Sequence, residues 1–375
     1  HQAVPEDPTL TADVPKFLYP PLLGMLMIPL SPLSYDTIKH IWFFANFFFI
    51  LHGIFLAVSI LPLQRFRLPA FFVLAALSLG SDAFSWLLRT AQVDGFALYL
   101  SLLALYFFHR EKWAAAALFI CMASWVKVTP GIFFIYLLTR GPRRFAIQAV
   151  IAGIMLGLAQ IATVQGEFFY FFTNTISEDM PSALRPPSMQ SLHALCQLLL
   201  VPFRGAHVFD APQQVESLLL ALKIAVSLAA VAVMLRRREG SDGLFAGFAV
   251  CSAVSLLVTD VSWMMRFSWN VITAAAILCF LFRVRNRAAA LVLFPVGALI
   301  LLLDLSSVWK GLFGPLVEWK ALFIAGPSLH ALLATVILLG ISLHRSQWSP
   351  FVQKSGELLV RIGHRLSTGS RTQVH

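Results

Sequence analysis

Apolar stretches of about 20 residues recur along this chain of 375 residues, separated by short basic or turn-rich pieces. Hydrophobic residues make up 58% of the sequence and charged residues only 12%, about half the charged share of a soluble domain. Apolar segments of this length span a bilayer as helices. The pattern therefore predicts an all-α, polytopic transmembrane helical bundle with about ten or eleven membrane segments, and it excludes an ordinary soluble globule.

Lysine and arginine occur in small clusters between the apolar stretches, so the formal charge of +10 is not gathered in one patch. We therefore predict no nucleic-acid partner. Cytoplasmic loops of membrane proteins collect these residues. One alternating topology puts all the clusters on the same side, with the basic tail 346–375 in the cytoplasm. Residues 19–345 then form a transmembrane domain among membrane lipids. Residues 1–18 are an outer polar segment, which we expect to be the end of a first outer loop.

Two pieces of this domain are too short to span, whereas residues 69–88 are long enough for one membrane segment. Between Lys112 and Arg140 the chain must go out and return in about 27 residues, so each arm is roughly 20 Å long against a hydrocarbon core of roughly 30 Å. Residues 22–29, which follow Tyr19-Pro20-Pro21, are also too short. Both read as re-entrant pieces whose tips face a water-filled depression or a protein cavity, because unpaired backbone is not tolerated against lipid.

Lys127 lies at the tip of the piece between Lys112 and Arg140. A charge inside a membrane segment costs at least about 2.5–3.5 kcal/mol and often has a function. The simple interpretation is a lone lysine that extends its ammonium group to the lipid headgroups. The functional interpretation, which we favour, is a cation that faces an anionic phosphate in the outer depression.

Arg89, Gln92 and Asp94 fall within one short outer loop. Charge-assisted hydrogen bonds would let Arg89 hold a phosphate and let Gln92 or Asp94 hold the hydroxyl groups of a sugar. The alternative is an outer loop with a local ion pair between Arg89 and Asp94, because such surface pairs are common and individually weak.

A second outward turn combines an acid, Asp260, with Arg266 and the indole rings of Trp263 and Trp269. These are the usual ingredients of a site for a sugar phosphate. Tryptophan also anchors helices at the membrane interface, so the indoles alone do not distinguish a site from an anchor.

Motifs for other chemistry are missing. The sequence has no GxGxxG, Walker loop, HExxH, GxSxG or CxxC spacing, so nucleotide, zinc and acyl-enzyme chemistry have no support. Its four cysteines are scattered and mostly lie inside apolar runs, which argues against a metal site and a disulfide framework. We expect neither a metal nor a cofactor.

Several short motifs follow one another in a fixed order. They are Tyr19-Pro20-Pro21, Ala91-Gln92-Val93-Asp94, Lys127-Val128-Thr129-Pro130, Ser188-Met189-Gln190-Ser191-Leu192 and Val261-Ser262-Trp263. Their order and spacing resemble the polyprenol-phosphate-dependent glycosyltransferases of family 87, also known as domain of unknown function 2029, in the C-type membrane glycosyltransferase superfamily. The second motif stands where that family usually has Gly-Gln-x-Asn. Met264, Met265 and Arg266 occupy a stretch where the family commonly has histidines.

The resemblance implies a C-type glycosyltransferase-like bundle in a bacterial plasma membrane, with its site facing outward. The implied reaction moves a mannose- or arabinose-like sugar from a polyprenyl-phosphate donor to a lipid or glycan acceptor. We assign substrate binding to Tyr19, Arg89, Gln92, Asp94, Lys127, Gln190, Ser191, Trp263 and Arg266. The catalytic carboxylate of the superfamily usually lies in the first outer loop, which we expect upstream of His1, and Asp260 is the best base within the chain.

Two other classes of protein are open to a chain of this composition. A multi-pass transporter or flippase of a lipid-linked or small anionic substrate would show paired half-helices and a related repeat in its two halves. A non-catalytic membrane assembly protein would need no polar groups clustered at re-entrant tips. Broken helices occur mainly in the first half and no clear repeat is visible, which favours the glycosyltransferase.

Overall fold

The computed structural model describes residues 19–173, 213–235, 241–258, 264–283, 295–301, 303, 330–331 and 333. All the regular elements in these ranges are helical, as the sequence predicts. Residues 1–18 and 346–375, which the sequence assigns to an outer segment and a cytoplasmic tail, lie outside them.

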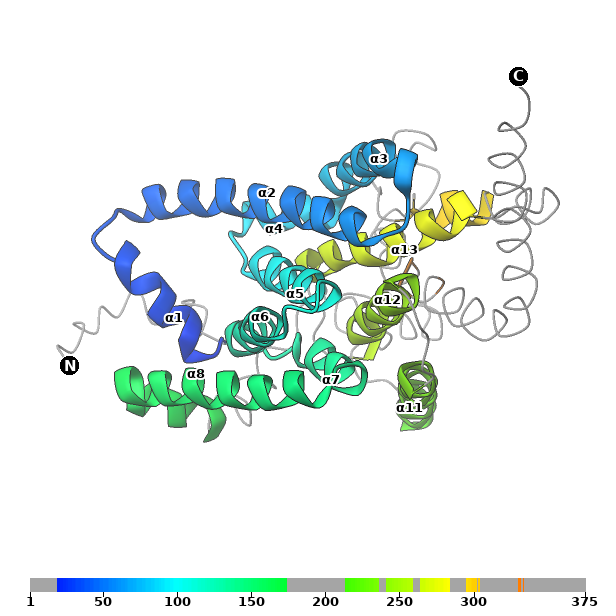
Figure 1. The fold of residues 1–375 in the computed structure, drawn as a ribbon. Helices are drawn as coiled ribbons and strands as arrows, with labels where there is room; N and C mark the ends of the chain where they lie inside the picture. The colour runs from blue at the N-terminus through cyan, green and yellow to red at the C-terminus, as the bar shows by residue number, and fades with distance from the viewer. Residues whose placement is uncertain are drawn as a thin grey trace, which may run out of the picture.

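Helices of very different lengths follow one another along the chain (Figure 1). They are α1 (Pro21–Met27), η1 (Ile28–Leu30), α2 (Tyr35–Ile60), η2 (Gln64–Phe66), α3 (Arg67–Gly80), α4 (Asp82–Arg89), α5 (Asp94–His109), α6 (Trp113–Val126), α7 (Gly131–Arg140), α8 (Arg143–Tyr170), α11 (Gln213–Leu235), α12 (Ser241–Val258), η4 (Met264–Trp269) and α13 (Asn270–Arg283).

Membrane-spanning length is reached by few of the described helices. Tyr35–Ile60 and Arg143–Thr173 are each long and apolar enough to cross a bilayer, and the pair α3 and α4 would be a third span if its two helices are counted together. The described residues therefore supply two or three spans by length and composition. This leaves the predicted number of ten or eleven segments unconfirmed, while the apolar helical bundle itself agrees with the prediction.

The structure divides the predicted segment 69–88 into two helices, which meet at an angle of 63°. Ser81 takes an extended conformation between them, with φ −78° and ψ 143°, and its hydroxyl accepts a hydrogen bond from Phe84 N. Serine is a favoured N-cap residue, and Asp82 follows it in the first turn, where a carboxylate favours a helix N-terminus. This polar cap interrupts a run that hydropathy alone treats as continuous.

The two pieces predicted to be too short to span are short in the structure. Helix α1 has 7 residues, α6 has 14 and α7 has 10. At 1.5 Å per residue, α6 and α7 are roughly 21 and 15 Å long, well below the roughly 30 Å of a hydrocarbon core. Lys127 and Pro130 lie between α6 and α7, at the tip of the hairpin.

The core lies between two long helices. Figure 1 shows α2 and α8 on opposite sides of α5 and α6, and successive neighbours in this series pack against each other. The α6–α8 contact is held by Cys121 Sγ and Trp125 Nε1, which donate hydrogen bonds to Ala149 O and Gly153 O of α8 at 3.3 and 3.2 Å. Small residues such as Ala149 and Gly153 let two membrane helices approach closely. Helix α1 packs on α6 and α8, so the half-helix belongs to this side of the bundle.

Candidate functional site

Four of the residues that the sequence proposes for substrate binding meet at one place. Tyr19 precedes α1, Gln92 lies in the α4–α5 connection, Asp94 begins α5, and Lys127 lies between α6 and α7. They come together because the hairpin and the half-helix are both short and pack against each other through α1 and α6.

Lys127 and Asp94 form an ion pair at the centre of this cluster. The Lys127 Nζ lies 2.7 Å from Asp94 Oδ1 and 2.8 Å from Oδ2, so both carboxylate oxygens accept from one ammonium group. The Asp94 side chain is only 1% exposed and that of Lys127 is 19% exposed. Two buried charges that neutralise each other cost far less than either one alone, which explains how a lysine and an aspartate coexist in this apolar chain.

The local backbone explains why Lys127 can reach the carboxylate. Helix α6 ends at Val126, and Lys127 takes an extended conformation with φ −150° and ψ 135°. Pro130, three residues later, is the N-cap of α7 and begins the return. The lysine therefore leaves the helix axis at a tip. Asp94 is the first residue of α5, where a carboxylate interacts favourably with the helix N-terminus.

Tyr19 covers the ion pair from the side of α1. Its hydroxyl donates a hydrogen bond to Gln92 Oε1, and the Lys127 Nζ lies 5.5 Å from the centre of its ring. An ammonium group at this distance from an aromatic face is attracted to it. Burial, and to a smaller extent the charge of Asp94, raises the pKa of the Tyr19 phenol above its ordinary value. Tyr19 is therefore a hydrogen-bond donor throughout the physiological pH range.

Three side chains fix the backbone of the α4–α5 connection. Trp42 Nε1 and Asn46 Nδ2 of α2 both donate to Gln92 O, at 3.1 and 3.0 Å. Trp269 Nε1 of η4 donates to Asp94 O at 3.1 Å. The connection is therefore held by α2 and η4, which are far apart in the sequence, and Asp94 is presented to Lys127 on a fixed backbone.

The half-helix α1 is tied to its neighbour α8 by Gln160. Leu22 N, one of the donors at the N-terminus of α1 that has no partner within the helix, donates to Gln160 Oε1 at 2.9 Å. Gln160 is fully buried, and its Nε2 donates to Leu156 O. The bond places the start of α1, and with it Tyr19, beside the hairpin.

Arg89 lies apart from this cluster. It is the last residue of α4 and its side chain is exposed. The alternative of a local Arg89–Asp94 ion pair is wrong, because Asp94 is buried and takes Lys127 as its partner. Arg89 faces the surface at the end of α4, where a cation is favoured by the helix C-terminus.

The other predicted site residues are only partly placed. Asp260, Gln190, Ser191 and Trp263 lie outside the described residues. Arg266 belongs to η4, which packs on α4 and α5, so its backbone lies in the element that touches the α4–α5 connection.

Sequence reasoning missed Trp42, Asn46 and Gln160, and treated Trp269 as no more informative than a membrane anchor. Asn46 and Gln160 each stand alone inside an apolar run. A buried polar side chain is costly unless it is hydrogen-bonded, so such an isolated amide is a detectable signal. Trp42 and Trp269 carry no comparable signal, because tryptophan is frequent in membrane helices for other reasons.

Ala91 adopts a backbone conformation with φ 50°, in the left-handed region that favours glycine. Ala91 occupies the position at which the family that the motifs resemble usually has Gly. We expect Ala91→Gly to be tolerated and Ala91→Val to destabilise the protein by about 1–3 kcal/mol, because a β-branched residue is strained at positive φ. Melting temperatures of the purified variants in one detergent test this. Equal stability of the two variants would contradict the described turn.

The described residues contain no group of three His, Cys, Asp or Glu side chains that could hold a metal ion. What the cluster offers chemically is one cation, one carboxylate and a phenol donor, gathered in an apolar surrounding at the tip of a hairpin.

A comparison with known families covers the first four of the motifs. A family model for glycosyltransferase family 87 matches residues 17–259, which is well over half of the chain and includes Tyr19, Gln92, Asp94 and Lys127. No curated protein matches the chain. The predicted family is thus confirmed: the chain belongs to glycosyltransferase family 87 and is an integral membrane glycosyltransferase.

Proposed function

We propose that this glycosyltransferase moves a mannose- or arabinose-like sugar from a polyprenyl-phosphate donor to a lipid or glycan acceptor at the outer face of a bacterial plasma membrane. The observation that carries the proposal is the ion pair of Lys127 with Asp94 at the hairpin tip. The phosphodiester of the donor carries one negative charge over two free oxygens, as a carboxylate does, so it can take the place of Asp94 at the ammonium group.

In the proposed reaction the acceptor hydroxyl oxygen forms a bond to the anomeric carbon while the bond from that carbon to the phosphate oxygen breaks. The electrons of the broken bond leave with the polyprenyl phosphate, and Lys127, assisted by Arg266, stabilises its negative charge. A carboxylate accepts the proton of the acceptor hydroxyl. Asp260 is the candidate within the chain, and a carboxylate in the first outer loop is the other.

The remaining polar residues orient the sugar. Gln92, Asp94, Gln190 and Ser191 are proposed to bind its hydroxyl groups, Trp263 to pack on its ring, and Tyr19 to donate to the phosphate or the sugar once Gln92 releases it. The family assignment favours this transferase over the transporter and the assembly protein that the composition alone left open.

Binding of radiolabelled decaprenyl-phosphate mannose to the protein in lipid nanodiscs tests the donor. We expect unlabelled decaprenyl phosphate to displace the label and GDP-mannose not to displace it. The variant Lys127→Gln/Asp94→Asn replaces both charged groups with neutral amides, and we expect it to bind at least tenfold more weakly. The proposal would be contradicted if GDP-mannose alone displaced the label, or if the variant bound the donor as tightly as the unmodified protein does.

A second arm of the same experiment tests transfer. Incubation of the loaded nanodiscs with a lipid extract should convert the label into a new covalent product. Movement of the intact donor across liposome membranes without any such product would identify a flippase instead.

A further inference from the structure

The indole of Trp269 lies between the two helices that follow the partners of the buried ion pair. Its side chain is fully buried, and its Nε1 donates to Asp94 O at the start of α5, at 3.1 Å. Its ring lies 5.5 Å from the ring of Phe133, at an interplanar angle of 29°, and Phe133 is the third residue of α7. One side chain therefore contacts both the residue that supplies the carboxylate and the helix that follows Lys127.

The hairpin tip that carries Lys127 has two arms, and each is held by different neighbours. Helix α6 ends just before the lysine and packs on α5. Helix α7 returns from the tip, where Phe133 N donates to Pro130 O at 2.9 Å, and the Phe133 ring stacks on Trp269. Loss of the indole would therefore loosen the α7 arm while the α6 arm keeps its packing.

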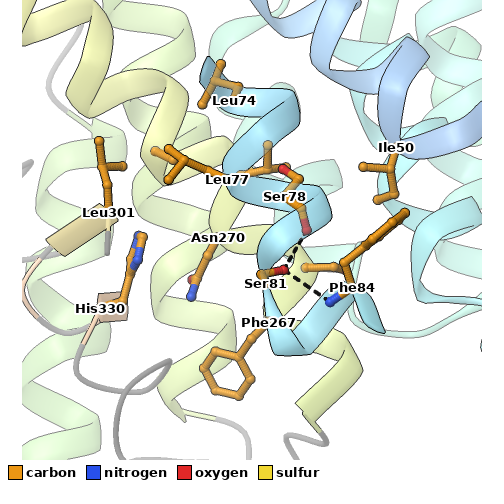
Figure 2. Close-up of a pocket in the computed structure, with 13 residues that line it drawn as sticks. Ile50, Leu74, Leu77, Ser78, Ser81, Phe84, Phe267, Asn270, Leu301 and His330 are labelled. Carbon is orange, nitrogen blue, oxygen red and sulfur yellow. Dashed lines mark hydrogen bonds between the residues drawn. The ribbon is translucent and has the colours of Figure 1, made fainter. Parts of the chain in front are cut away.

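The indole itself is held by α12 and by close packing around η4. Ser252 Oγ of α12 donates to Trp269 O at 3.3 Å, and the ring of Phe248, also from α12, stacks on Phe133 at 4.0 Å. Residues next to Trp269 in the sequence line a cavity of about 20 Å³, which is room for about one water molecule (Figure 2). Element η4 has no larger space into which it could shift, so the indole keeps its distance to both neighbours.

The ion pair depends on this fixed distance. Lys127 Nζ contacts the two Asp94 oxygens at 2.7 and 2.8 Å, and hydrogen bonds weaken steeply when their geometry is disturbed. A shift of either backbone by about 1 Å would break at least one of the two contacts, and a misplacement of about this size can cost roughly 100-fold in an enzymatic rate.

We propose that Trp269 is a positioning residue that sets the spacing between Lys127 and Asp94. Its effect on sugar transfer rests on the proposed function, in which Lys127 binds the phosphate of the donor and Asp94 the sugar. Its effect on the ion pair does not depend on that function.

Amine labelling of the full chain in detergent tests the spacing. Reductive methylation with formaldehyde and a borane requires a neutral amine, so a lysine held by a carboxylate reacts slowly. Mass spectrometry of peptides reads each lysine separately. Trp269→Phe removes the N–H donor and keeps a ring beside Phe133. We expect it to raise the methylation rate of Lys127 at least threefold and to leave that of the exposed Lys112 unchanged.

Two comparisons separate positioning from general loosening of the fold. Trp113→Phe is the matched control, because it makes the same change at the other end of α6, where the indole packs on Phe108 and Phe145. It should leave the labelling of Lys127 unchanged. In an Asp94→Asn background Trp269→Phe should add nothing further, since no carboxylate is left to be positioned.

Three labelling results would overturn the proposal. They are an unchanged rate at Lys127 in Trp269→Phe, an equal increase at Lys127 and Lys112, and an equal increase with and without the Asp94 carboxylate. Each would show that Trp269 only fills the core.

Transfer from decaprenyl-phosphate mannose, measured on the same variants, tests the link to catalysis. We expect Trp269→Phe to lower the rate at least tenfold and Trp113→Phe to leave it unchanged. An active protein whose rate is unaffected by Trp269→Phe would also overturn the proposal. If the unmodified protein transfers no sugar while the labelling follows the expected pattern, the proposed function is wrong and the control of the ion pair by Trp269 is supported.

Discussion

Lys127→Ala is expected to destabilise the folded protein by about 3–5 kcal/mol, because it leaves the buried Asp94 carboxylate without the ammonium group that both its oxygens contact. The same change should lower the rate of sugar transfer by about 10²–10³-fold, which is typical for loss of one group that stabilises a leaving charge. Melting temperature, followed by tryptophan fluorescence, and transfer from a polyprenyl-phosphate sugar measure the two effects.

The double variant Lys127→Gln/Asp94→Asn separates the two effects. It removes both charges, so no buried charge is left without a partner and most of the lost stability should return. Transfer should stay as low as in Lys127→Ala, because the cation for the phosphate is still missing. Recovery of both properties would show that Lys127 only balances Asp94, and an unchanged melting temperature in Lys127→Ala would contradict the buried ion pair.

Gly95→Ala is expected to destabilise the protein by about 1–3 kcal/mol, the usual cost of overpacking a well-packed core. An added Cβ at this position would lie 2.4 Å from Asn46 Oδ1 and 3.2 Å from Leu87 Cδ2, so Asn46 must move. Asn46 holds the carbonyl oxygen of Gln92, and its displacement should loosen the connection that presents Asp94. Both melting temperature and transfer rate should fall.

Gly131→Ala is the matched control for this change. Gly131 also begins a helix next to the candidate site, but a Cβ there would meet nothing within 4 Å. We expect its stability and activity to be close to those of the unmodified protein. The double variant Gly95→Ala/Asn46→Ser shortens the obstructing side chain and should be more stable than the sum of the single changes predicts. Strict additivity would show that the contact with Asn46 is not the cause.

Much of the candidate site could be predicted from local sequence. Tyr19, Gln92, Asp94 and Lys127 all lie at ends or tips of apolar segments, and the short hairpin and half-helix were visible from segment length alone. Their partners could not be predicted. Lys127 and Asp94 are 33 residues apart, and the choice of Lys127 over the nearby Arg89 depends on which side chain points into the bundle.

The break at Ser81 shows a different limit of sequence reasoning. Hydropathy over residues 69–88 is continuous, so a window average predicts one span. The serine cap and the following Asp82 are helix-start signals, but they compete with the apolar run. Only packing, of α3 against α13 and of α4 against η4, settles the direction of α4.

The bond from Trp269 to Asp94 O also bears on how the protein is made. The two residues are separated by 175 positions in the chain. At a synthesis rate of 5–20 residues per second, the indole leaves the ribosome about 9–35 s after the carbonyl group that it will hold. During that interval α5 is already long enough to enter the membrane. The backbone around Asp94 still lacks the hydrogen bond from Trp269, which is one of its three side-chain restraints. Biosynthesis thus completes the three restraints on this connection only once η4 has been made.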